Sequence, residues 1–145
     1  MRFALKGYPM CECVRIRVKG SHTDVGLSRA HIPPGGYWVA WVEDEDVGGI
    51  ASFPVDLMPR SAAESLLRRL VRVAERGRQA IKGELGDLPR WQKDNGQYVE
   101  FMLDGHTFTV ARFWGPKYGW GPWAVIGGLD AILPQGAEGE VWVGR

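Results

Sequence analysis

Cysteine is scarce in this chain: Cys11 and Cys13 are its two thiols, and they lie two positions apart. Small secreted domains that depend on disulfides carry several cysteines at well-separated positions. In an extended segment the Cα atoms of Cys11 and Cys13 would lie near the limit of about 7 Å for a disulfide. We therefore expect reduced thiols and a fold that is held by a hydrophobic core.

Long apolar runs and an excess of one charge are also missing. A membrane-spanning helix needs about 20 consecutive apolar residues, and no run approaches that length. Residues 1–6 lack the apolar stretch of a secretion signal. The chain has 18 basic and 17 acidic side chains, whereas a dedicated duplex-DNA binder carries a basic excess that neutralises phosphates. The sequence predicts a cytoplasmic protein without membrane association.

No catalytic, cofactor-binding or metal-binding signature is present. The glycine pairs do not stand between a strand and the start of a helix, as a phosphate-binding loop requires. Zinc prefers thiolate and imidazole ligands, but Cys11 and Cys13 lack the second close-set ligand pair of a structural site. The acidic run 43–46 is more simply a solvated turn than a Mg²⁺ or Ca²⁺ site. The sequence predicts no metal and no cofactor, and favours a binding protein over an enzyme.

Glycine, proline and tryptophan, in contrast, are abundant. Twenty glycines and nine prolines among 145 residues indicate many tight turns and short strands rather than a helical bundle. Seven tryptophans are also many for this length. Tryptophan is large and rigid, so it either fills a core or offers a stacking surface in a binding site.

Strands are predicted on both sides of one helix. Alternating apolar and basic residues predict a strand over 14–18, and a run of β-formers predicts another over 37–42, with 50–55 as its hairpin partner. Residues 20–36 are predicted to form a loop. Further strands are predicted at 98–103, 106–113, 123–126 and 141–143, with a loop over 127–139.

The clearest element is a helix from Ser61 to about Lys82. Ser61 and Glu64 have the spacing of an N-terminal capping box, and a glycine at 83 or 86 would end the helix. Apolar residues recur at three- and four-residue steps along one stripe. Ala74 and Gly77 are the small members of this stripe, and they would let the helix backbone approach a sheet closely.

The dipeptide Asp104-Gly105 predicts a tight hairpin between 98–103 and 106–113. A type I′ turn needs positive φ at both central residues, and Asp-Gly is among the commonest choices. A two-residue loop fixes the register. It pairs Leu103 with His106, Phe101 with Phe108 and Val99 with Val110 on one apolar face.

Together these elements predict an α+β fold. The expected architecture is a mainly antiparallel sheet of about six to seven short strands with one long amphipathic helix packed on one face. Residues 83–97 are linker-like but too few to separate two cores. Residues 1–145 should therefore form a single domain.

The segment from Phe113 to Trp123 is the most unusual part of the chain. It places five aromatic residues among eleven, and Trp-Gly-Pro occurs in it twice, six residues apart. Gly-Pro steps force turns, and a loop that turns twice cannot hide every ring in a sheet core. We expect one or two rings at the surface, beside Lys117. The alternative is that the rings close over the end of the core as a plug.

Arginines line the polar side of the predicted helix. They could bind phosphates or an acidic protein surface, or they could form a solvated face that is partly paired with Glu64 and Glu75. The basic residues of the strand 14–18 would point to the opposite side of the sheet. The two basic patches cannot form one groove, and this disfavours a nucleic-acid site.

A surplus of rigid aromatic side chains without a catalytic constellation predicts a small non-enzymatic binding module. It would occlude or adapt a protein or ribonucleoprotein partner, as small inhibitors from mobile elements do. The alternatives are a small-ligand binder that stacks a nucleotide or sugar on the same loop, a nucleic-acid binder, and an enzyme that uses His106, His31 or a glutamate. The predicted partner-binding residues are Trp114, Lys117, Tyr118, Trp120, Trp123, Arg68, Arg69, Arg72 and Arg76.

Overall fold

A computed structural model describes part of the chain. The backbone is described for residues 2–4, 10–17, 23–29, 38–44, 48–53, 60–133 and 138–144, and the side chains for residues 65, 66, 68–133, 140, 141 and 143. These residues form an α+β fold with one long helix and antiparallel strands. The predicted fold class is thus confirmed.

The elements follow one another with short connections. The helix α1 spans Arg60–Lys82, and a turn of 3₁₀ helix, η1, spans Leu129–Ala131. The strands are β1 (Arg2–Ala4), β2 (Met10–Arg17), β3 (Thr23–Arg29), β4 (Trp38–Asp44), β5 (Gly48–Phe53), β6 (Arg90–Lys93), β7 (Gly96–Leu103), β8 (His106–Gly115), β9 (Gly119–Trp120), β10 (Trp123–Gly127), β11 (Glu138–Gly139) and β12 (Val141–Gly144).

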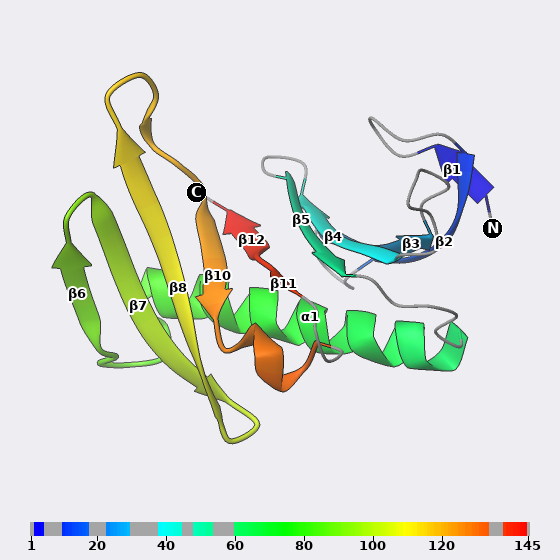
Figure 1. The fold of residues 1–145 in the computed structure, drawn as a ribbon. Helices are drawn as coiled ribbons and strands as arrows, with labels where there is room; N and C mark the ends of the chain where they lie inside the picture. Colours follow the sequence, from blue (N-terminus) through cyan, green and yellow to red (C-terminus); the bar gives the residue numbers. More distant parts are fainter. Residues whose placement is uncertain are drawn as a thin grey trace.

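The strands form two sheets rather than one. The first sheet has the order β1-β2-β3-β4-β5-β11, and the second has the order β12-β10-β8-β7-β6, with β9 paired to β8. The chain passes from the first sheet to the second between β11 and β12, next to Glu140. Figure 1 shows α1 running past both sheets, and α1 contacts strands of each.

The prediction of one sheet with about six to seven strands therefore needs correction. The strand β3 lies within residues 20–36, which were expected to be loop, and it pairs with β2 on one side and β4 on the other. The strand β6 lies within the expected linker 83–97. Both strands have weak local β-signals, and pairing with the adjacent strands of their sheets decides their conformation. The predicted hairpin of the strands around 37–42 and 50–55 is present as β4 and β5.

The end of α1 follows the predicted glycine stop. Gly83 has a φ of 75°, a left-handed conformation that glycine adopts without a Cβ clash. The amide of Gly83 donates to the carbonyl of Ala80, and that of Glu84 donates to the carbonyl of Gln79. This pair of bonds is a Schellman motif. The predicted capping box at Ser61 and Glu64 lies outside the described side chains.

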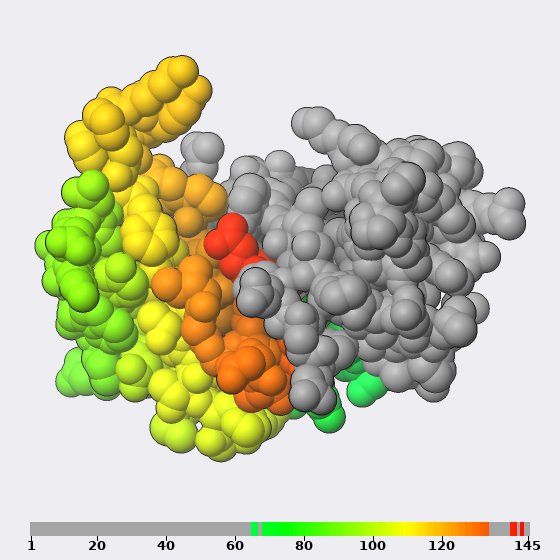
Figure 2. Space-filling model, in the orientation of Figure 1, coloured from blue at the N-terminus to red at the C-terminus, as the bar shows by residue number. Residues whose placement is uncertain are grey.

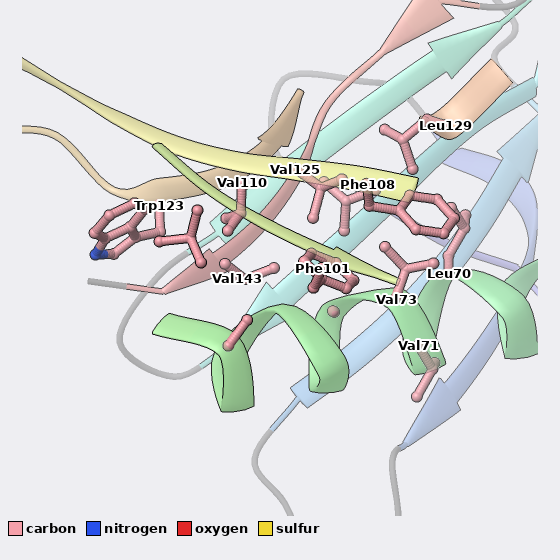
Figure 3. Close-up of a cluster of buried hydrophobic side chains, with 14 of the residues drawn as sticks. Leu70, Val71, Val73, Phe101, Phe108, Val110, Trp123, Val125, Leu129 and Val143 are labelled. Carbon is pink, nitrogen blue, oxygen red and sulfur yellow. The ribbon is translucent and has the colours of Figure 1, made fainter. Parts of the chain in front are cut away.

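The apolar stripe of α1 packs on the second sheet. Leu70, Val73 and Ala74 are buried against residues of β7, β8, β10 and β12, and Figure 3 shows this core. A Cβ at Gly77 would lie 3.3 Å from Cγ1 of Val143 on β12. The helix backbone thus comes close to the sheet at Gly77, as its small size predicts.

The hairpin of β7 and β8 has the predicted register. Leu103 pairs with His106, Phe101 with Phe108 and Val99 with Val110. Asp104 and Gly105 have φ values of 51° and 77°, as a type I′ turn requires. Phe101 and Phe108 are buried and stack with their ring centres 5.5 Å apart. A turn signal of two residues therefore positions half of the core of the second sheet.

Candidate binding surface

The aromatic segment is a short hairpin rather than an irregular loop. The end of β8 pairs with β9, so that Trp114 lies opposite Trp120 and Gly115 opposite Gly119. Gly119 has a φ of 72° and closes the turn. The amide of Gly121 donates to the carbonyl of Phe113 at 2.8 Å and fixes the base of the hairpin. We call residues 113–120 the aromatic hairpin, and Figure 1 shows it extending beyond the rest of β8.

Most rings of this segment face solvent. The exposed fractions are 84% for Tyr118, 49% for Phe113, 45% for Trp114 and 39% for Trp120. The space-filling view in Figure 2 shows the hairpin projecting from the body. The prediction that some rings reach the surface is confirmed, and the alternative that all of them plug the core is wrong. Lys117 is also exposed, with its Nζ 5.2 Å from the ring centre of Tyr118.

Trp123 is the exception, because its side chain is 6% exposed. It begins β10, which lies between β8 and β12 in the second sheet. A residue on the helix-facing side of an interior strand is covered by the core. Its predicted role as a surface contact therefore needs correction, and its indole supports the residues beside it.

Arg112 joins the aromatic hairpin to the sheet. Its guanidinium carbon lies 4.5 Å from the ring centre of Trp120 and 5.0 Å from that of Trp123. Its Nε donates to Oε1 of Gln97, the residue opposite it on β7, at 2.7 Å. Stacking on both indoles and the hydrogen bond hold the guanidinium in a fixed orientation.

A second aromatic cluster covers the face of the sheet away from α1. The rings of Trp91 and Tyr98 stack with centres 5.2 Å apart, and Tyr98 meets Phe113 edge to face at 5.9 Å. Trp91 is 39% exposed. Neither Trp91 nor Tyr98 is among the predicted site residues, because the sequence predicts no strand at β6 that would bring Trp91 beside Tyr98. The two-residue connection Asp94-Asn95, with Asp94 at a φ of 52°, is the signal that indicates this hairpin.

The arginines of α1 lie far from the aromatic hairpin. The side chains of Arg68, Arg69, Arg72 and Arg76 are exposed. Arg72 donates to both carboxylate oxygens of Asp104, at 2.8 and 3.1 Å. Asp104 is at the other end of β8, and nine residue steps of a strand span roughly 30 Å. The structure does not bring these arginines and the hairpin together.

Two hollows lie at opposite ends of the second sheet. A cleft of about 640 Å³ is lined by Ile81, Arg90, Trp91, Gln92, Gln97, Tyr98, Val99, Arg112 and Trp123. A smaller one of about 280 Å³ is lined by Arg69, Arg72, Val73, Leu103, Asp104, His106, Phe108, Ala131 and Ile132. The larger cleft contains no acidic side chain, whereas in the smaller one Asp104 is already paired with Arg72.

The described residues form no group of three histidines, cysteines or carboxylates that could hold a metal ion. His106 is exposed next to the Asp104-Gly105 turn. The side chains of Cys11, Cys13, His22 and His31 lie outside the described part. The helix α1 is not apolar enough over its described length to span a bilayer.

No family model, curated protein or solved structure matches this chain.

Proposed function

We propose that this protein is a small non-enzymatic binding module, similar in action to an inhibitor or adaptor, and that the aromatic hairpin is its contact with a protein partner. The observation that supports this most is the exposure of Phe113, Trp114, Tyr118 and Trp120 on one projecting two-stranded element. An isolated exposed ring is ordinary, but four exposed rings on one projection indicate an interaction site.

The rings suit a protein surface because they are already ordered. Trp114 and Trp120 are held opposite each other by strand pairing, and Trp120 is stacked on Arg112. Tryptophan and tyrosine lose little conformational entropy on binding, and they dominate the binding energy of many interfaces. A partner that offers an apolar pocket would gain most of its affinity from these few side chains.

The exposed arginines of α1 are a second proposed contact, separate from the first. Arg68, Arg69 and Arg76 are exposed, and Arg72 is paired with Asp104. Only a partner that extends along the whole of β8 would reach both surfaces. We place the main contact at the aromatic hairpin, since surface charges contribute little affinity by themselves.

The experiment compares partner capture by single variants. Trp114→Ala and Tyr118→Ala remove exposed rings of the hairpin. Met102→Ala removes an apolar side chain near the other end of the sheet, whose exposed fraction of 58% lies between those of Trp114 and Tyr118. Each immobilised protein captures partners from the source cell, and mass spectrometry quantifies the proteins bound. Circular dichroism melting verifies that each variant is folded.

We expect the wild type and Met102→Ala to capture the same protein, and the two hairpin variants to capture it at least about tenfold less well, since a lost anchor costs about 2 kcal/mol or more. Equal capture by all four folded proteins would show that the hairpin is not the contact.

A further inference from the structure

The second sheet has one face against α1 and another that faces away from it. Side chains alternate along a strand, so the neighbours of the buried Val99 and Phe101 point away from the helix. Strand pairing places Trp91 beside Tyr98 and Tyr98 beside Ala111 on that side. We call the side of β6, β7, β8 and β10 away from α1 the outer face. Figure 1 shows β7 and β8 in front of α1, and Figure 2 shows these strands at the surface.

The outer face exposes large apolar side chains. The exposed fractions are 58% for Met102, 49% for Phe113, 40% for Ile126 and 39% for Trp91. A sheet with apolar residues on both faces normally has a packed layer on each side. The helix α1 supplies the layer on one side, and no described element supplies one on the other. The composition of the outer face therefore indicates a contact with another molecule.

The charges of the outer face suit a second copy of the same chain. Among the described residues of its four strands, the charged ones on this face are Lys93 and Glu100, one of each sign. In a two-fold dimer the same surface meets itself, so a face of one sign would repel its copy. The polar side of α1, with its arginines, is such a face. The net charge of the whole chain is +1, and a net charge near zero favours association.

The pairing of the strands also arranges these two charges for a two-fold contact. Lys93 lies two residues beyond Trp91 on β6, and Glu100 lies two residues beyond Tyr98 on β7. Because the two strands are antiparallel, the two charges lie on opposite sides of the row that contains Trp91 and Tyr98. A two-fold axis along this row would exchange the two sides. Lys93 of one copy would then face the row that contains Glu100 of the other.

The size of the outer face is sufficient for a stable contact. Five strands at about 4.8 Å and eight residues at about 3.4 Å give a face of roughly 24 by 27 Å, or about 650 Å² in projection. A standard interface buries about 800 Å² per partner, and the accessible area of an uneven face exceeds its projection. Two such faces would pack as a sandwich, with the sheets about 10 Å apart.

We propose that two copies of this chain associate through their outer faces, as a two-fold dimer in which the second sheets pack against each other. Trp91, Tyr98 and Phe113 supply apolar contact, and Lys93 of each copy faces the row of Glu100 in the other. The dimer is independent of the protein contact proposed above, because Trp114 and Trp120 lie on the opposite side of the strands from the outer face.

Sedimentation velocity of the purified chain, at concentrations up to about 200 µM, tests the proposal. Phe113→Lys and Ile126→Lys place a charge on the outer face. Trp114→Lys is the matched control, because Trp114 is the next residue on β8, has an exposed fraction of 45% and points to the other side. Circular dichroism melting verifies that each variant is folded.

A further variant separates this contact from pairing between sheet edges. The strand β6 is an edge of the second sheet. The amide of Glu100 donates to the carbonyl of Pro89, and the alternation of bonds from this pair directs the backbone of Gln92 away from β7. Gln92→Pro removes a donor from the free edge without breaking a bond to β7.

We expect the wild type to sediment with a mass near twice the 16.2 kDa of the chain. Phe113→Lys and Ile126→Lys should raise the Kd of the dimer by about tenfold or more, since each buries an ammonium group in an apolar contact. Trp114→Lys and Gln92→Pro should leave the Kd unchanged.

A charge reversal tests the pairing of the two faces without removing any apolar side chain. Glu100→Lys makes both charges of the outer face positive, so we expect a weaker dimer, most clearly at low salt. The same change combined with Lys93→Glu restores one charge of each sign, and the dimer should regain its strength.

Four results would overturn the proposal. A wild type that is monomeric at the highest concentration would leave the outer face to a different partner. Folded Phe113→Lys and Ile126→Lys proteins that both dimerise like the wild type would exclude the outer face. Dissociation by Gln92→Pro alone would assign the dimer to the edge of β6. Dissociation by Trp114→Lys as strong as that by Phe113→Lys would assign it to the aromatic hairpin.

Discussion

The two ends of β8 carry similar residues in opposite surroundings. At the end near Asp104, the strand turns tightly, Phe108 is buried against α1 and η1, and Arg72 of the helix pairs with Asp104. At the other end, the strand continues beyond the helix, Phe113 and Trp114 are exposed, and Arg112 has no acidic partner among the described residues. Coverage by the helix, rather than residue type, decides which rings form the core and which form a surface.

The largest expected difference in stability between the two ends is that between alanine variants of two phenylalanines of β8. Phe108 is 1% exposed and Phe113 is 49% exposed. Phe108→Ala should lower the free energy of unfolding by about 3–5 kcal/mol, because it leaves a cavity in the core. Phe113→Ala should lower it by about 1 kcal/mol or less, mainly through the lost edge contact with Tyr98. Urea unfolding followed by circular dichroism measures both values, and similar losses would refute the contrast between the two ends.

Substitutions of two glycines, one at each end, should also differ in their loss of stability, but by less. Gly128 has a φ of 92°, and a Cβ there would overlap the carbonyl oxygen of Thr107 and come within 2.8 Å of the Phe108 ring. A Cβ at Gly115, in the aromatic hairpin, would meet nothing within 4 Å. Gly128→Ala should cost about 2–3 kcal/mol of stability, and Gly115→Ala less than about 1 kcal/mol. Thermal melts of the two variants and the wild type measure these losses of stability. A Gly128→Ala protein as stable as the wild type would contradict the packing described at the covered end.

The parts of the fold that could be predicted are those set by local chemistry. Asp104-Gly105 determines the register of β7 and β8 because the turn admits few backbone conformations. The stripe with Ala74 and Gly77 determines which side of α1 meets the sheet. The Gly-Pro steps around Trp114 and Trp120 correctly indicate exposed rings. Each of these inferences needs only residues that are close in the sequence.

The features of the fold and of the site that could not be predicted depend on contacts between residues that are distant in the sequence. The division into two sheets follows from the order in which strands pair, which no local pattern encodes. The burial of Trp123 depends on the place of β10 between β8 and β12. The pairing of Arg72 with Asp104, 32 positions away, and the cleft at Arg112 depend on the length of α1 relative to β8. The aromatic segment is therefore predictable from the sequence, whereas the sheet that presents it is not.

Hydrogen exchange of the purified complex with the captured partner tests the central claim most directly. We expect the partner to slow amide exchange in residues 113–120 and to leave residues 102–106, at the covered end of the same strands, unchanged. Protection of residues 102–106 with unchanged exchange in residues 113–120 would contradict the proposed contact.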